Sequence, residues 1–127
     1  MNIKILEVEH SKNIKKVKFK TSIGIGVGVW EGQLPTKGTS IDIEIDIDDI
    51  FDWGENINTT NLNESIITID GNLFNFVAEV ISYETDSCLI VKLNKSIVLL
   101  DVENAPNNIQ GWIEVKTENL KLYPTNL

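Results

Sequence analysis

The sequence is poor in the side chains that most often carry catalysis and metal binding. It has one cysteine, Cys88, one histidine, His10, and no arginine, since all 11 basic residues are lysine. A single cysteine excludes an internal disulfide, and one histidine with one cysteine falls short of the usual zinc ligand set. The missing arginine removes the bidentate side chain that suits phosphate and guanine. We therefore expect no metal and no cofactor.

The same scarcity argues against an enzyme. A nucleophilic triad would need His10 to be oriented by a carboxylate, but His10 stands in an expected turn beside Lys12 with no identifiable partner. Cys88 begins an apolar run that ends at Val91, which is typical of a buried, inert thiol. Catalysis by carboxylates alone is the class left open, and a chain of 127 residues without a cleft-forming insertion does not favour it. We predict a protein without catalytic activity.

Long apolar runs are also missing. No stretch approaches the roughly 18 apolar residues of a membrane span, and charge interrupts residues 1–7 too early for a signal peptide. Apolar residues make up 42% of the chain and charged residues 24%, which is the range of globular domains. We therefore expect one soluble all-β domain over residues 1–127, cytoplasmic and without a membrane partner.

Acidic residues, in contrast, are plentiful and unevenly spread. The net charge is −8. Residues 1–20 hold six lysines and two acids, whereas residues 42–55 hold seven acids and no lysine. A lysine cluster beside exposed aromatic rings would suggest nucleic-acid binding, but Phe19 lies in phase with Val17, opposite the lysines, and the acidic remainder would repel phosphate. We do not expect nucleic acid as the partner.

The clearest pattern in the chain has a period of two. Four isoleucines alternate with four carboxylates, which on a β-strand gives one apolar face and one charged face. The isoleucines are Ile41, Ile43, Ile45 and Ile47, and the carboxylates are Asp42, Glu44, Asp46 and Asp48. The charged face is either a surface that attracts a basic partner or the solvated face of an edge strand, where charge prevents aggregation. Carboxylates two apart on a strand lie about 6–7 Å from each other, which is too far to chelate an ion without a further ligand.

Other alternating segments predict further strands and hairpins. Asn2–Glu9 and Ile14–Ser22 are expected to pair around a turn at residues 10–13. Two tighter hairpins are expected at Asp70-Gly71-Asn72 and at Asn94-Lys95. The strands on either side of these two turns are Ile66–Asp70 with Leu73–Ser82 and Leu89–Leu93 with Ser96–Val102, and the remaining ones are Ile23–Trp30, Gly111–Lys116 and Leu120–Tyr123.

These segments predict an all-β fold with little or no helix. We expect a small single-domain barrel or sandwich of about nine short antiparallel strands, SH3-like or OB-like. A single helical turn is expected over Asp49–Trp53. The polar stretch Thr59–Asn63 is expected to divide the chain into two sub-sheets that share one core.

Glycines and tryptophans mark two further places of interest. Gly24, Gly26 and Gly28 face one way along a strand, which indicates either close packing under an aromatic ring such as Trp30 or a groove where a ligand approaches the backbone. Trp30 and Trp53 stand beside loops, and tryptophans in such places are enriched at interfaces. We expect a surface role for one of these two tryptophans.

Taken together, these patterns favour a protein-interaction module with an acidic strand face. The expected partner is a protein. One concrete hypothesis is that the module is a bacterial immunity or antitoxin-type protein that neutralises a basic toxin, and the partner is then basic. The partner-binding residues predicted are Asp42, Glu44, Asp46, Asp48, Trp30 and Trp53. The alternatives are an OB-like nucleic-acid-binding barrel and a small-ligand-binding barrel with its pocket beside the glycine row. No pattern predicts an oligomeric state.

Overall fold

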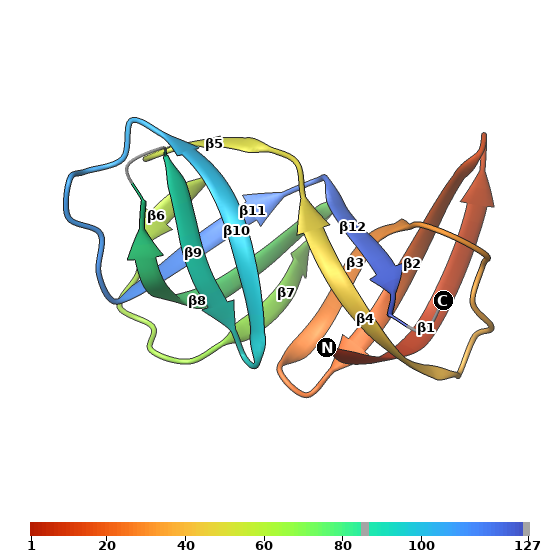
Figure 1. Ribbon diagram of the computed structural model, residues 1–127. Coiled ribbons are helices and arrows are strands. Elements are labelled where there is room, and N and C mark those ends of the chain that lie inside the picture. The colour runs from red at the N-terminus through yellow and green to blue at the C-terminus, as the bar shows by residue number, and fades with distance from the viewer. Residues whose placement is uncertain (85–86, 126–127) are drawn as a thin grey trace.

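The computed structural model describes residues 1–84 and 87–125, and its regular elements there are all β-strands. The strands form two lobes that lie side by side (Figure 1). The prediction of an all-β chain built as a small barrel is confirmed. The described residues include no helix long and apolar enough to span a membrane.

Five strands close into a barrel that makes up the first lobe. They are β1 (Asn2–Ser11), β2 (Ile14–Thr21), β3 (Gly24–Trp30), β4 (Ser40–Ile47) and β12 (Leu120–Pro124). The pairing runs from β1 through β2, β3, β12 and β4 back to β1, and every pair is antiparallel except β3 with β12. This circular order, in which the last strand of the barrel lies parallel to the third, is that of an OB-type barrel. Of the two barrel types expected, the first lobe is therefore OB-like.

The second lobe is inserted between the fourth and fifth strands of this barrel. Its strands are β5 (Ile50–Asp52), β6 (Ile57–Thr59), β7 (Ile66–Asp70), β8 (Leu73–Tyr83), β9 (Cys88–Leu93), β10 (Ser96–Glu103) and β11 (Trp112–Thr117). The long strand β8 pairs with β7, β9 and β11, and β10 extends the sheet by pairing with β9 and, in parallel, with β5. A bridge between Trp53 and Ile57 brings the two ends of this curled sheet together.

The predicted hairpins are confirmed, and residues with positive φ explain where they turn. β1 and β2 are joined through Lys12 and Asn13, whose φ angles are 52° and 66°. Gly71 (φ 62°) and Asn94 (φ 56°) begin the other two turns. Asparagine and glycine tolerate this left-handed conformation better than other residues, so the local sequence places these turns.

Four details of the predicted fold are wrong. The described residues form 12 strands and not about nine, and two of them, β5 and β6, are too short to show an alternation. The strands are not all antiparallel, since β3 pairs in parallel with β12 and with β7, and β10 pairs in parallel with β5. The segment predicted as a helical turn, Asp49–Trp53, contains β5 instead. The lobes do share a core, but they are divided where the chain crosses at residues 48–49 and 118–119, not at Thr59–Asn63, which lies within the second lobe.

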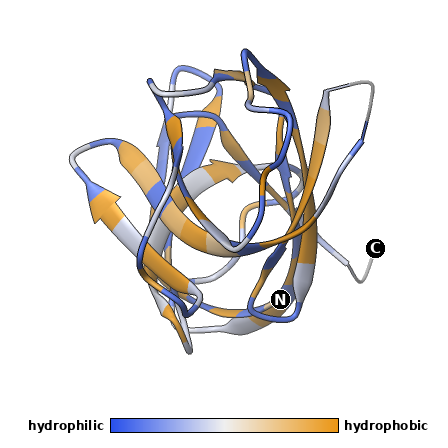
Figure 2. Cartoon of the chain, turned by 90° about the vertical axis from the view of Figure 1, so that its left-hand side faces the viewer, coloured by the Kyte–Doolittle hydropathy of each residue, from blue (hydrophilic) through white to orange (hydrophobic). Residues whose placement is uncertain are grey.

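One cluster of buried side chains runs through both lobes. Apolar and polar residues alternate along the strands that wall the molecule (Figure 2). Val17 and Phe19 are both fully buried, as predicted from their phase opposite the lysines. The ring of Phe19 on β2 meets the ring of Phe74 on β8 with 6.2 Å between their centroids, which joins the interior of the barrel to that of the second lobe.

The glycine row on β3 faces this interior. A Cβ at Gly26 would lie 2.5 Å from Cζ of Phe19, and one at Gly28 would lie 3.1 Å from Cδ2 of Leu120. Close packing is therefore the reason for these glycines, although the ring that covers Gly26 belongs to Phe19 and not to Trp30. Gly28 also lines an open groove over β1, β2 and β3, so a ligand site beside the glycine row stays a prediction.

Candidate functional site

The four carboxylates of the acidic strand are all exposed: Asp42, Glu44 and Asp46 lie on β4, and Asp48 follows its last residue. On the other phase of the strand, the isoleucines are buried at positions 43 and 47 and half-buried at positions 41 and 45. The predicted two-faced strand is thus confirmed. β4 pairs with β1 over residues 40–42 and with β12 over residues 43–47. The half of the strand that carries Glu44 and Asp46 is thus paired on one side only, and both interpretations of its charges stand.

Asp42 and Asp48, at the two ends of the acidic strand, have polar partners. The hydroxyl of Thr125 donates a hydrogen bond to Asp42 over 3.0 Å, and the amino group of Met1 lies 3.2 Å from the same carboxylate. The hydrogen bond and then the amino group lower the pKa of Asp42. Asp48 and Lys121 form an ion pair of 2.6 Å, whose hydrogen bond lowers the pKa of Asp48 and raises that of Lys121.

The two central carboxylates, Glu44 and Asp46, differ from those at the ends. Their side chains are exposed, and within the described residues neither forms an ion pair. In the register with β12 they lie opposite Tyr123 and Lys121, and this lysine is already engaged by Asp48. The middle of the acidic strand therefore presents negative charge that the protein itself does not compensate.

A groove of about 430 Å³ runs beside the acidic strand, where the two lobes meet. Asp42, Glu44 and Ile45 line it from β4, and Ser96 and Ile97 line it from the start of β10. The groove thus has carboxylates on one wall and an exposed aliphatic side chain on the other.

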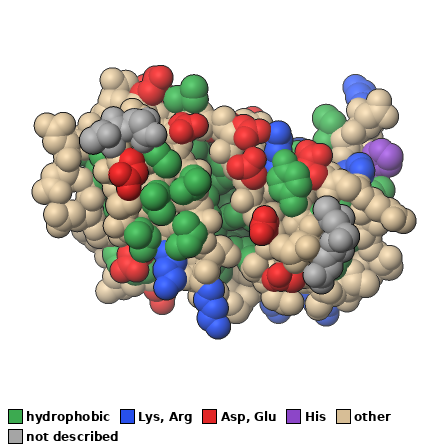
Figure 3. All heavy atoms as spheres, viewed as in Figure 1, with side chains coloured by type: hydrophobic (Ala, Val, Ile, Leu, Met, Phe, Trp, Pro, Cys, Tyr) green, Lys and Arg blue, Asp and Glu red, His purple; other side chains and the backbone are tan. Residues whose placement is uncertain are grey.

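The outer surface of the second lobe continues from this groove as an apolar face. It consists of Ile50, Ile81, Ile90, Ile97 and Leu99. Leu99 is 59% exposed and Ile97 57% exposed, and both lie on the part of β10 that pairs with β9. Leu99 lies opposite Ile90 in the register of β9 and β10. In Figure 3 hydrophobic side chains gather over the second lobe, and acidic side chains lie between them and the first lobe.

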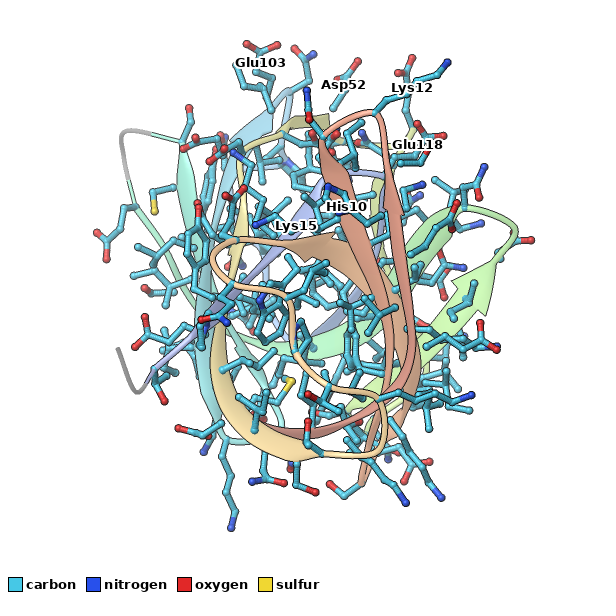
Figure 4. The ribbon with its side chains drawn as sticks, turned by 90° about the vertical axis from the view of Figure 1, so that its right-hand side faces the viewer. His10, Lys12, Lys15, Asp52, Glu103 and Glu118 are labelled. Atoms are coloured by element: carbon cyan, nitrogen blue, oxygen red, sulfur yellow. The ribbon has the colours of Figure 1, made fainter. Side chains whose placement is uncertain are left out.

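Charged residues border the apolar face at its two ends. Asp101 and Glu103 continue the outward phase of β10, and Asp52 lies opposite Glu103 on β5 (Figure 4). The amide of Asn104 donates a hydrogen bond of 2.8 Å to Asp52. Lys92 lies opposite Ile97 at the other end. The rim is thus acidic toward the ends of β5 and β10 and basic toward the β9–β10 turn.

The sequence did not lead us to this apolar face, although it carried a signal. Ile97-Val98-Leu99-Leu100 is apolar in both phases of the strand, unlike the alternating segment of β4. Such a run is typical of a strand covered on both faces. In this structure only Val98 and Leu100 are buried, and the outward phase is left open to solvent.

The two tryptophans predicted for the surface behave differently. Trp30 is only 2% exposed, and its ring nitrogen donates a hydrogen bond of 2.8 Å to the carbonyl of Gln33. A surface role for Trp30 is therefore wrong, because it shares the inward phase of Gly26 and Gly28 on β3. Trp53 is half-buried and packs against the core beside the Trp53–Ile57 bridge.

The lysine-rich hairpin of β1 and β2 lies on another side of the barrel. Glu7 lies opposite Lys18 and Glu9 opposite Lys16, so that acids balance part of the basic cluster. An open groove of about 240 Å³ over β1, β2 and β3 is lined by these four residues and by Glu118, among others, with no aromatic side chain among the described residues that line it.

The remaining candidates for chemistry stay apart from one another. His10 is exposed on β1, opposite Lys15 on β2 (Figure 4). Cys88 is half-buried, not fully buried as predicted, because it begins β9 at the rim of the second lobe. Among the described residues no group of three or more His, Cys, Asp or Glu side chains could hold a metal ion.

Comparisons with known proteins return no family model, no curated protein and no solved structure that matches this chain.

Proposed function

We propose that this protein is a non-catalytic interaction module that binds a basic protein through its acidic strand. The observation that carries the proposal is the pair Glu44 and Asp46, which are exposed and form no ion pair among the described residues. An immunity or antitoxin-type protein that covers a basic toxin is a concrete version of this function. A cytoplasmic location, as expected from the sequence, is part of the proposal.

The physical role of such charge is to speed and orient the encounter. Complementary potentials raise association rates and disfavour partners of the wrong charge, and this effect weakens as salt screens it. Because Asp42 and Asp48 are already partnered, the two central carboxylates should account for most of the effect. The proposed association should therefore slow with added salt.

The proposal can be tested by affinity capture from the native host, with three forms of the protein as bait. Wild type should retain a basic protein that the Glu44→Gln/Asp46→Asn double variant loses. A matched control, Glu7→Gln/Glu9→Gln, removes the same charge from the β1–β2 hairpin and should retain that protein. Equal retention by all three forms would contradict a role for the acidic strand.

The OB-like strand order supports a second candidate, because OB barrels bind oligonucleotides and oligosaccharides across their second and third strands. A groove does lie over β1, β2 and β3 here. Glu7, Glu9 and Glu118 line it, however, and single-strand binders pair a basic groove with stacking aromatic rings. A mobility-shift assay with a single-stranded oligonucleotide at low salt separates the candidates, since a salt-sensitive shift would favour nucleic acid.

A further inference from the structure

The acidic strand and the apolar face border the same groove. Glu44 lines it from the first lobe and Ile97 from the second. We infer that both surfaces form one composite interface, on which the partner is a basic protein with an apolar ridge flanked by lysine or arginine. This inference rests on the proposed function and adds to it the part of the surface that would hold the complex together.

The apolar face has the properties expected of the centre of an interface. Its side chains come from neighbouring strands. Leu99 on β10 lies opposite Ile90 on β9, and Asp101, also on β10, lies opposite Ile50 on β5. Ile50, Ile97 and Leu99 are each more than half exposed. Contiguous exposed apolar surface on a soluble protein commonly marks a binding site. Burying it would supply the hydrophobic driving force that exposed charge pairs lack.

The charge around this face identifies the kind of occupant. Asp42 and Glu44 line the groove, and the amino group of Met1 lies 3.2 Å from Asp42. Three carboxylates and a lysine border the apolar face, namely Asp52, Asp101, Glu103 and Lys92. A second copy of this chain would bring two negatively charged faces together, and an anionic membrane surface would be repelled as well. A basic protein complements this charge.

The residues that line the groove suit a long basic side chain. Ile45 and Ile97 are aliphatic and Glu44 is charged, and all three line the groove. A lysine or arginine side chain packs its aliphatic stem on apolar surface while its charged end reaches a carboxylate. We therefore expect a basic side chain of the partner to lie in the groove, with the partner's apolar residues over Ile97 and Leu99.

The composite interface can be tested with two synthetic peptides and amide NMR spectra of the full chain. One peptide alternates leucine with lysine, and its matched control alternates serine with lysine. The leucine–lysine peptide should bind roughly tenfold more tightly than the serine–lysine peptide. It should shift amide signals of β4 and of β10 as far as Leu99, whereas the control should shift those of β4 and of the groove residues Ser96 and Ile97.

Two double variants separate this inference from the proposed function. Ile97→Ser/Leu99→Ser should lower the affinity for the leucine–lysine peptide roughly tenfold and that for the serine–lysine peptide by a smaller factor, since only the lysine stem then loses its contact with Ile97. Glu44→Gln/Asp46→Asn should weaken both peptides. Ile14→Ser, at another exposed isoleucine on the β1–β2 hairpin, is the matched control and should change neither affinity. Because the substituted side chains are exposed, all of these variants should fold, which circular dichroism will verify.

The outcomes distinguish the two claims. If the Ile97→Ser/Leu99→Ser variant binds the leucine–lysine peptide as wild type does, while the acidic variant does not, the composite interface is overturned and the acidic strand stands. If neither variant changes binding, both claims fail. If sedimentation shows that wild type forms a dimer that Ile97→Ser/Leu99→Ser abolishes, the occupant is a second copy and the inferred basic partner is wrong.

Discussion

Phe19 and Phe74 meet across the two lobes, with 6.2 Å between their ring centroids and 41° between their ring planes. The backbone of Gly26 passes directly beneath this contact. A Cβ there would lie 2.5 Å from Cζ of Phe19 and 2.8 Å from Cε1 of Phe74. The absence of a side chain at Gly26 is what allows the two rings, and with them the two lobes, to pack together.

Gly26→Ala should therefore destabilise the protein by overpacking. We expect a loss of about 1–3 kcal/mol in the free energy of unfolding, since both rings are buried and neither can shift into open space. Urea denaturation measures the loss. Phe74→Leu should relieve part of the clash, so that the double variant loses less than the sum of the single variants. Strict additivity would contradict the packing explanation.

Asp49→Ala should loosen the junction where the chain crosses between the lobes. Asp49 accepts hydrogen bonds of 2.6 Å from the hydroxyl of Thr117 and from the side-chain amide of Asn119, and so ties the two crossing segments together. Leaving these donors without their acceptor should cost about 1–3 kcal/mol. Urea denaturation gives the loss, and amide hydrogen exchange at residues 117–121 should become faster. Asp46→Ala, a nearby exposed carboxylate without an ion pair, is the control and should change neither quantity.

The ion pair of Asp48 and Lys121 should make stability depend on pH at both extremes. Because the pKa of Asp48 is lowered from 3.8 by folding, its contribution is present above that value and is lost as the pH falls through the folded pKa. The pKa of Lys121 is raised from 10.5, so its contribution is lost as the pH rises through the folded value. When urea denaturation is repeated at decreasing pH, the free energy of unfolding of Asp48→Asn should fall less than that of wild type. Identical acid profiles would show that the pair contributes nothing measurable.

Leu99→Ser and Leu100→Ala should change the free energy of unfolding by very different amounts, although the two residues are adjacent on β10. Leu100 is 1% exposed, and truncating it should cost about 2–5 kcal/mol. Leu99 is 59% exposed, and its replacement should change the free energy of unfolding by less than about 0.5 kcal/mol. Urea denaturation of both variants checks the assignment of faces. A large loss for Leu99→Ser would mean that the outer face is covered in the native protein.

Much of the local structure could be predicted because it depends on near neighbours in sequence. The alternation of isoleucine with carboxylates predicted which face of β4 is charged, and positive-φ residues such as Asn13 and Asn94 marked the hairpins. Strands of three residues, such as Ile50–Asp52, carry too little pattern to be recognised. The apolar face was missed because an apolar residue on an outward phase looks the same in sequence as one that is buried.

The sides of each strand thus follow from sequence alone, since successive side chains on a strand point in opposite directions whatever lies next to it. Tertiary structure decides which side meets the core and which strands become neighbours. Trp30 is buried because β3 turns Gly26 and Gly28 toward Phe19, Leu120 and Leu122. Residues 43–47 of β4 have a paired strand because β12 returns to them after the whole second lobe. Those contacts join residues far apart in the chain, and only the packing of the entire molecule selects them.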